Sequence, residues 1–137
     1  MKLDRIAIWT RQLEKLKMFY IRYFKASANL KYIYEYEVKA NNKIRFESYS
    51  LAFESGARLE LIKKASIVIG NDGDHFNAGI TQITFCVNSP DELEWLFADL
   101  KVGGIPIVRT PHVTGDGYYE ACVLDPDGNR IEIAVKL

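Results

Sequence analysis

Apolar residues in the first half of the chain recur at two different spacings, which predict one helix among several strands. The helical spacing is kept by Leu13, Leu16, Phe19, Tyr20 and Tyr23. Residues 11–24 are therefore expected to form an amphipathic helix, with Thr10 as its N-cap. Residues 3–9 are apolar nearly throughout and predict a strand before the helix. Alternating apolar and polar residues predict further strands at residues 32–38, 44–54 and 58–63.

The second half of the chain shows the same order of elements. Ser89, followed by Pro90 and by Glu92, is typical of a capped helix start. Gly103 and Gly104 predict the end of that helix. Strands are expected at residues 80–87, 105–109, 118–124 and 130–135.

The repeated order indicates a duplicated unit. The segment 65–78, which contains the turn signal Asn71-Asp72-Gly73-Asp74, is the best candidate for a connector. We expect a single domain over residues 1–137, with module one at about 1–64 and module two at about 79–137.

Composition and charge restrict the partners of the protein. Lys and Arg number 18, Asp and Glu also number 18, and the formal net charge is zero. Nucleic acid and anionic membranes are therefore not expected as partners, because both attract basic proteins. No apolar run approaches the roughly 20 residues that cross a bilayer, and the opening Met1-Lys2-Leu3-Asp4-Arg5 is unlike a signal peptide. A cytoplasmic protein is expected, with Cys86 and Cys122 as free thiols.

Strand alternation groups four polar residues. Side chains along a strand point alternately to the two faces of its sheet. In four of the predicted strands the large aliphatic residues share one face, which should cover a helix. The opposite face then carries Arg5, Glu60, Gln82 and Glu132.

Four stretches of the sequence resemble the glyoxalase/bleomycin-resistance/dioxygenase superfamily, also called the vicinal oxygen chelate superfamily. They are residues 3–9, residues 58–62, residues 79–85, and the ending formed by 115–120 with 125–133. The most specific is the ending, where Asp125-Pro126-Asp127-Gly128-Asn129 leads into a strand that bears Glu132. The resemblance implies an α+β fold, in which two βαβββ modules form a cupped, mostly antiparallel sheet with a cleft.

The resemblance also implies a metal site. In metal enzymes of this superfamily the ligands come from the first and last strands of each module, usually two histidines or glutamines and two glutamates. The matching positions here are Arg5, Glu60, Gln82 and Glu132. Glu60, Gln82 and Glu132 would then hold a divalent metal such as Zn or Ni, with Glu60 and Glu132 as the catalytic groups. Arg5 cannot be a ligand, because a guanidinium has no free lone pair.

Arg5 leaves three interpretations of these positions open. Two unit charges of the same sign about 4 Å apart repel each other by roughly 1 to 4 kcal/mol, and the repulsion between Arg5 and a divalent metal ion would be twice this value. Arg5 could replace the metal by pairing with carboxylates. Alternatively, a metal site could work from Glu60, Gln82 and Glu132 alone. In the third interpretation these residues form only surface ion pairs, which contribute roughly 0 to 1 kcal/mol.

Other residues with candidate chemistry lie outside these four positions. His112, in the predicted loop 110–114, and Tyr118 join Arg5 as candidate substrate-binding residues, because in the superfamily this region lies near the cleft. His75 falls in the connector and is interpreted as a solvated residue. Cys86 shares a face with Gln82, and we interpret it as a buried, inert thiol rather than a reactive one.

Two functions follow from the resemblance. The first is a lyase or isomerase of the lactoylglutathione-lyase type with a degenerate metal site. The alternative is a metal-free small-molecule-binding protein of the bleomycin-resistance type. A dioxygenase is disfavoured, because open ferrous sites need two histidines and a carboxylate. A homodimer is expected, since exposed aromatic residues invite a second copy and symmetric dimers are common.

Overall fold

The computed structural model describes residues 4–39, 42–64, 80 and 82–137 of the chain. It divides into two compact units, Met1–Asn71 and Asp72–Leu137, called here the first and second units. The predicted connector 65–78 lies outside the described residues. Neither described helix is long and apolar enough to cross a membrane.

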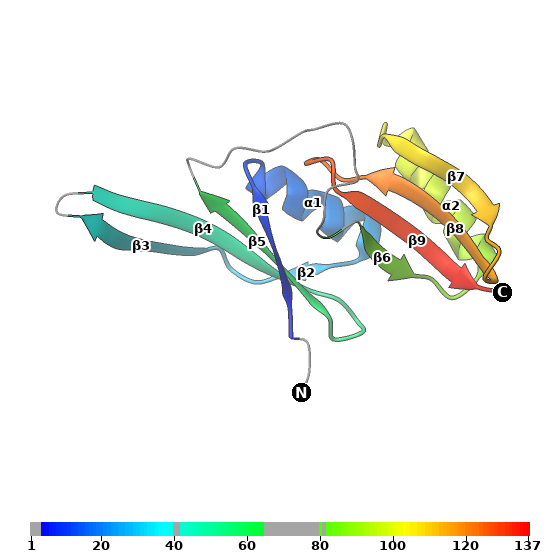
Figure 1. The fold of residues 1–137 in the computed structure, drawn as a ribbon, viewed down its shortest axis with the longest axis horizontal. Helices are drawn as coiled ribbons and strands as arrows, with labels where there is room; N and C mark the ends of the chain where they lie inside the picture. Colours follow the sequence, from blue (N-terminus) through cyan, green and yellow to red (C-terminus); the bar gives the residue numbers. More distant parts are fainter. Residues whose placement is uncertain (1–3, 40–41, 65–79, 81) are drawn as a thin grey trace. The chain divides into compact units, whose positions relative to one another are not determined.

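The first unit is a five-stranded sheet with one helix (Figure 1). Its elements are β1 (Ile6–Thr10), α1 (Leu13–Phe24), β2 (Ser27–Ala28), β3 (Tyr32–Lys39), β4 (Asn42–Ala52) and β5 (Arg58–Lys64). The strand order is β1-β5-β4-β2, and β3 pairs with β4 as a hairpin. Only the β1–β5 pair of this sheet is parallel.

One face of this sheet packs against α1. The apolar stripe predicted for the helix is buried, and it faces Leu51, Leu59 and Leu61 of the sheet. Burying one such side chain stabilises the fold by roughly 1.5 to 3 kcal/mol. The other face of the sheet, turned away from α1, is called here the far face. In the second unit the far face is likewise the sheet face turned away from the helix of that unit.

The second unit repeats the arrangement with a four-stranded sheet. Its elements are β6 (Ile83–Cys86), α2 (Pro90–Val102), β7 (Ile107–Val113), β8 (Tyr118–Leu124) and β9 (Arg130–Lys136). The order is β6-β9-β8-β7, and only β6–β9 is parallel. Buried Leu93, Phe97 and Leu100 of α2 pack on the sheet face that carries Ile131 and Ile133.

The predicted α+β class and the start of α2 are confirmed. Ser89 Oγ accepts a hydrogen bond from the backbone N–H of Glu92 at 3.1 Å, and Pro90 is the first helical residue. The cap predicted for the first helix is wrong. Helix α1 begins at Leu13, and Thr10 ends β1, where its Oγ1 accepts from the N–H of Gln12 at 2.9 Å. The threonine hydroxyl therefore closes a local turn before the helix instead of capping it.

Three predicted boundaries differ from the structure. Strand β1 begins at Ile6 rather than at residue 3, and β6 begins at Ile83 rather than at residue 80. Strand β7 runs on to Val113, so the predicted loop 110–114 is largely strand. Pro111 hid this strand, because proline cannot donate to a ladder and is confined to edges and bulges. Strand β7 lies at the sheet edge, and its register shifts between Ile107 and Arg109 and again before His112.

Candidate functional site

The far face of the first sheet carries an ion pair between Arg5 and Glu60. Glu60 lies in the centre of β5, opposite Ala7 of β1 and Ser50 of β4. Because Leu59 and Leu61 on either side of it are buried under α1, its carboxylate points to the far face. Arg5 Nε lies 3.2 Å from Glu60 Oε2, with the two side chains 52% and 24% exposed. The structure thus brings these two predicted residues together.

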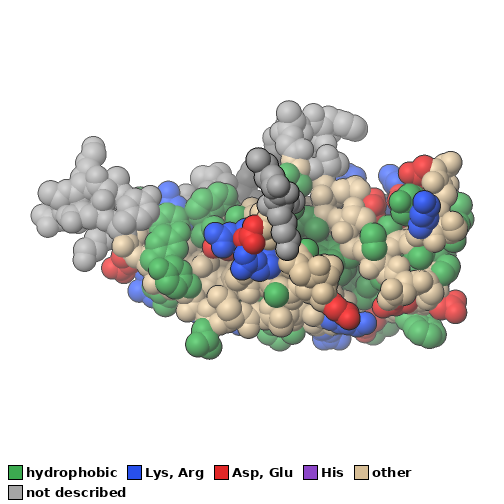
Figure 2. All heavy atoms as spheres, turned by 90° about the horizontal axis from the view of Figure 1, so that it is seen from below, with side chains coloured by type: hydrophobic (Ala, Val, Ile, Leu, Met, Phe, Trp, Pro, Cys, Tyr) green, Lys and Arg blue, Asp and Glu red, His purple; other side chains and the backbone are tan. Residues whose placement is uncertain are grey.

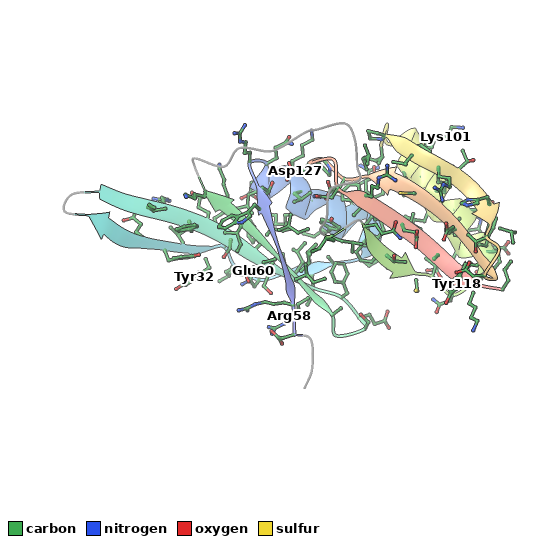
Figure 3. The ribbon with its side chains drawn as sticks, in the orientation of Figure 1. Tyr32, Arg58, Glu60, Lys101, Tyr118 and Asp127 are labelled. Carbon is green, nitrogen blue, oxygen red and sulfur yellow. The ribbon has the colours of Figure 1, made fainter. Side chains whose placement is uncertain are left out.

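A second ion pair lies beside the first. Arg58, two residues before Glu60 on β5, binds the Asp4 carboxylate through its guanidinium. This hydrogen bond raises the pKa of Arg58, and the charge of Glu60 acts in the same direction. Figure 3 labels Arg58 and Glu60, which both belong to β5.

An aromatic row adjoins these ion pairs on the far face. It consists of Trp9, Phe46, Tyr34 and Tyr32. Trp9 lies 6.0 Å from Phe46 between ring centroids, and Tyr34 stacks on Phe46 at 4.9 Å. Trp9 and Tyr32, at the two ends, are 53% and 60% exposed. Figure 2 shows hydrophobic side chains gathered beside acidic and basic ones on this unit.

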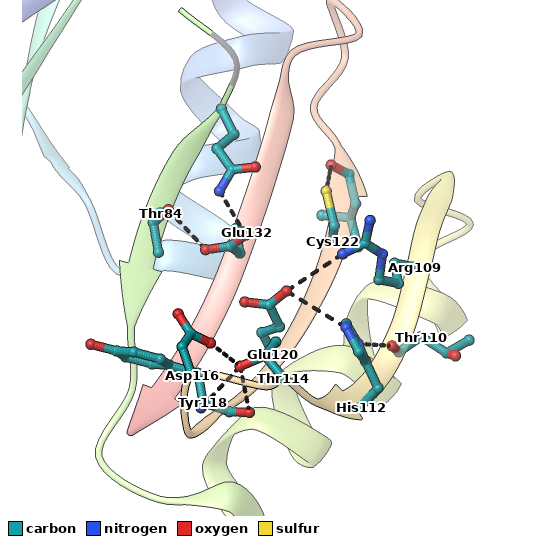
Figure 4. Close-up of polar contacts among 12 residues, drawn as sticks. Thr84, Arg109, Thr110, His112, Thr114, Asp116, Tyr118, Glu120, Cys122 and Glu132 are labelled. Atoms are coloured by element: carbon teal, nitrogen blue, oxygen red, sulfur yellow. Dashed lines mark hydrogen bonds and ion pairs between the residues drawn. The ribbon is translucent and has the colours of Figure 1, made fainter. Parts of the chain in front are cut away.

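In the second unit the matching carboxylate is held by hydrogen bonds. Glu132 lies in β9, opposite Thr84 of β6 and Cys122 of β8. Gln82 Nε2 donates to Glu132 Oε2 at 2.6 Å, and Thr84 Oγ1 donates to Oε1 at 3.1 Å (Figure 4). Both carboxylate oxygens therefore accept a hydrogen bond. Gln82 itself precedes β6.

These residues do not fit a divalent metal. A ligand must turn a lone pair toward the ion, whereas Glu60 faces a guanidinium that is always charged. Gln82 turns its amide nitrogen toward Glu132, as it must, because an amide oxygen would be repelled there. No three His, Cys, Asp or Glu side chains form a metal-binding group within the part of the chain that the structure describes.

A further polar cluster on the far face of the second sheet joins His112, a predicted substrate-binding residue, to Arg109 and Glu120, which were not predicted. Arg109 Nη1 and His112 Nε2 lie 3.5 and 3.6 Å from the same oxygen, Oε1 of Glu120. The other ring nitrogen of His112 lies 3.1 Å from the backbone carbonyl of Thr110. The Glu120 side chain is only 15% exposed. In Figure 4 dashed lines join it to Arg109 and to His112, which both come from β7.

One signal for this cluster was present in the sequence. Alternation along β8 places Glu120 and Cys122 on one face, the same argument that found Glu132 on β9. The contacts of Arg109 and His112 with Glu120 could not be predicted in this way. Arg109 and His112 are three residues apart, yet the bulges of β7 bring His112 opposite Glu120 and Arg109 opposite Cys122.

The remaining predicted site residues have mixed outcomes. Tyr118 is half-buried, and its backbone N–H donates to Thr114 Oγ1 at 3.0 Å. His75 lies outside the described residues. The prediction that Cys86 is buried is wrong, because it is exposed on the edge strand β6. Cys122 is the buried thiol, and this burial raises its pKa.

Each unit is a sheet of parallel and antiparallel strands, with a helix on one face and a central carboxylate on the other. This repeated arrangement defines a duplicated α+β protein. The model of the Glyoxalase/Bleomycin resistance protein/Dioxygenase superfamily matches residues 2–133, and the chain belongs to this superfamily. No curated protein sequence matches the chain significantly.

Solved structures share the fold at low sequence identity. A glyoxalase family protein from Bacillus cereus has a TM-score of 0.80 and 17% identity, covering 100% of this chain and 95% of that one. A glyoxylase/bleomycin resistance protein/dioxygenase domain from Frankia has a TM-score of 0.78 and 13% identity, with 100% and 98% covered. Lactoylglutathione lyase from Agrobacterium tumefaciens has a TM-score of 0.60 and 19% identity, with 97% and 92% covered. At these identities the likeness concerns the fold.

Proposed function

We propose that the protein is a metal-independent small-molecule-binding protein of the bleomycin-resistance type. The observation that carries this proposal is the ion pair between Arg5 and Glu60. The Arg5 guanidinium occupies a place where metal enzymes of the superfamily have a ligand, and it neutralises the neighbouring carboxylate. A second cation placed there would be repelled by Arg5.

The aromatic row supports a planar ligand. Trp9 and Tyr32 expose ring surface at the two ends of the row, while Phe46 within the row is buried. Stacked or tilted aromatic pairs contribute about 0.5 to 1.5 kcal/mol beyond their buried area. A flat, mostly apolar molecule would therefore bind over the row. Arg5, on the same far face, is more than half exposed and can hold an anionic group of that molecule.

The second candidate function is a lyase or isomerase of the lactoylglutathione-lyase type. Glu60 or Glu132 would then move a proton of the substrate. The two hydrogen bonds that fix the Glu132 carboxylate favour this candidate, because a proton carrier must be held in one position. His112 and Tyr118 remain proposed substrate-binding residues in either function.

Two further properties are proposed, the oligomeric state and the location of the protein. Exposed Trp95 and Val102 on α2 support a homodimer, which sedimentation equilibrium would detect. The free thiols Cys86 and Cys122 support a cytoplasmic location, because reducing compartments keep thiols in this state.

The first experiment tests metal independence. Purified protein is titrated by calorimetry with Zn²⁺, Ni²⁺, Mn²⁺ and Fe²⁺, alongside Glu132→Ala and Arg5→Gln. The wild type is expected to bind none of these ions stoichiometrically. Tight binding that disappears in Glu132→Ala, together with conversion of a hemithioacetal, would replace the binding function with the lyase function.

The second experiment tests the aromatic row. The chain has two tryptophans, so Trp95→Phe leaves Trp9 as the only indole reporter. Titration with 1-naphthol, a neutral planar aromatic, is expected to quench Trp9 fluorescence saturably. The matched control is Trp9→Phe, in which Trp95 on α2 should respond only by collision. Equal, linear quenching of both variants would reject the row as a binding surface.

A further inference from the structure

Arg130 is an unusual arginine of the second unit. It begins β9 two residues before Glu132, so its side chain belongs to the far face, while Ile131 between them is fully buried under α2. Its Nε–H is buried, and no acceptor for it lies within the described residues. Buried donors are nearly always paired in folded proteins, so a missing acceptor requires an explanation.

The matching arginine of the first unit has no such deficit. Arg58 stands two residues before Glu60, as Arg130 stands two residues before Glu132. Arg58 is neutralised by Asp4. No carboxylate pairs with Arg130 in the part of the chain that the structure describes. Glu132, on the same strand, accepts instead from Gln82 and Thr84.

A second guanidinium lies on the far face of the same sheet, with β8 between its strand and that of Arg130. Arg109, on β7, stands opposite Cys122 of β8. Its only ion pair among the described residues is the 3.5 Å contact of Nη1 with Oε1 of Glu120. More than half of its side chain is exposed. Its remaining N–H groups are therefore available to an incoming acceptor.

Strand register places both arginines around Cys122 on the far face, because Arg109 stands opposite Cys122 and Arg130 stands opposite Leu124, two residues further along β8. Burial raises the pKa of the Cys122 thiol, and the charges of Arg130 and Arg109 oppose that increase. The carboxylates of Glu132 and Glu120 also act on it, in the direction of the burial. Of the two carboxylates, Glu132 accepts hydrogen bonds at both oxygens, and Oε1 of Glu120 contacts Arg109 and His112.

We propose that Arg130 and Arg109 bind an oxyanion, the carboxylate or phosphate group of a small molecule, on the far face of the second sheet. An oxyanion supplies the acceptor that the buried Nε–H of Arg130 lacks. The planar fork of a guanidinium matches both carboxylate and phosphate geometry. The site goes beyond the proposed aromatic ligand, because it needs neither the aromatic row nor Arg5.

The test uses the whole protein with inorganic phosphate and with acetate as probes. Side-chain Nε–Hε signals of the arginines are followed by nitrogen–proton correlation spectroscopy at pH 7, with ionic strength held constant by chloride. The Arg130 and Arg109 signals are expected to shift saturably. The signal of Arg58, which is already paired with Asp4, is expected to stay in place. The probe that saturates at the lower concentration identifies the group as phosphate or carboxylate.

Variants test the residues separately. Arg130→Gln is expected to weaken probe binding about tenfold, which corresponds to about 1.4 kcal/mol. Arg109→Gln, at an exposed position, should weaken it in the same direction, and Arg58→Gln should leave it unchanged. Backbone amide spectra establish that each variant is folded. If Arg130→Gln fails to fold, the wild-type titration and Arg109→Gln decide the outcome.

Shifts of Arg130 and Arg109 that are linear and no larger than that of Arg58 would overturn the proposal. Equal probe affinity in wild type and Arg109→Gln would also overturn it. Neither result depends on 1-naphthol, whose binding is read at Trp9 in the first unit. Failure of the proposed function and failure of this site are therefore distinguishable.

Discussion

The two units place a glutamate at the same point of the same kind of sheet and stabilise it by different means. In the first unit, Ala7 stands opposite Glu60 and cannot donate a hydrogen bond, and the charge is met by Arg5. In the second, Thr84 stands opposite Glu132 and donates to it together with Gln82. The duplicated backbone fixes where the carboxylate lies, and a few neighbouring side chains decide what that carboxylate can do.

The largest expected effect concerns the matched core positions Leu61 and Ile133, both fully buried. Leu61→Ala and Ile133→Ala should each lower the free energy of unfolding by about 2 to 5 kcal/mol. Urea denaturation followed by circular dichroism measures the loss, while Trp9 and Trp95 fluorescence report the two units separately. Coincident transitions would show that the units unfold together. A loss below about 1 kcal/mol at either position would contradict the packing described.

The turns before β5 and β9 should differ in how much an alanine substitution lowers the free energy of unfolding. Buried Asp125 accepts from the N–H groups of Asp127 and Asn129 at 3.0 and 2.8 Å, whereas exposed Ser55 accepts one weak bond of 3.3 Å from Ala57. Asp125→Ala should cost about 1 to 3 kcal/mol, because buried donors lose their acceptor. Ser55→Ala should stay within about 0.5 kcal/mol. Equal urea midpoints for the two variants would contradict this difference.

Low pH should lower the stability of the first unit, because Glu14 becomes protonated. Hydrogen bonds from Lys17, Lys31 and Tyr49 lower the pKa of Glu14 from 4.5 to about 2. Because the folded pKa is the lower one, the stabilisation is present above pH 4.5 and disappears as the pH falls toward about 2. The side chain is more than half exposed, so the loss should be less than about 1 kcal/mol.

Urea midpoints measured between pH 6 and pH 2 give the size of this effect. Glu14→Gln is the matched control and should flatten that part of the pH profile. Identical profiles for the wild type and the variant would show that the network contributes nothing to stability.

The smallest expected effect is a difference in reaction rate between the two thiols of the second unit, with no change in the stability of the protein. Cys86 is exposed, whereas Cys122 is buried and its pKa is raised by that burial. Iodoacetamide should therefore modify Cys86 first, since the thiolate is the nucleophile. Peptide mass spectrometry over time measures both rates. Faster modification of Cys122 would indicate that the guanidiniums near it outweigh its burial.

Features that depend on local spacing were predictable from the sequence. The apolar stripe of α1, the Ser89 cap of α2 and the faces of β5 and β9 follow from side-chain periodicity. The placement of Glu60 and Glu132 on the far faces rests on the same argument.

Features that depend on contacts across the sheet were not predictable. Two bulges align Arg109 and His112 with β8, and the positions of these bulges do not follow from the spacing of residues in the sequence. That no described residue accepts a hydrogen bond from the Nε–H of Arg130 emerges only from the three-dimensional positions of those residues. Exposure of Cys86 likewise follows from the position of β6 at the edge of its sheet.

The irregular strand β7 has a consequence for association. It is the outer strand of its sheet, and an unprotected outer strand is a template on which another chain can add. Pro111 offers no N–H to such a strand, and two register shifts break the regular spacing of the remaining groups. Growth of the second sheet by strand addition is thereby disfavoured along this edge, which protects the protein against aggregation at that point.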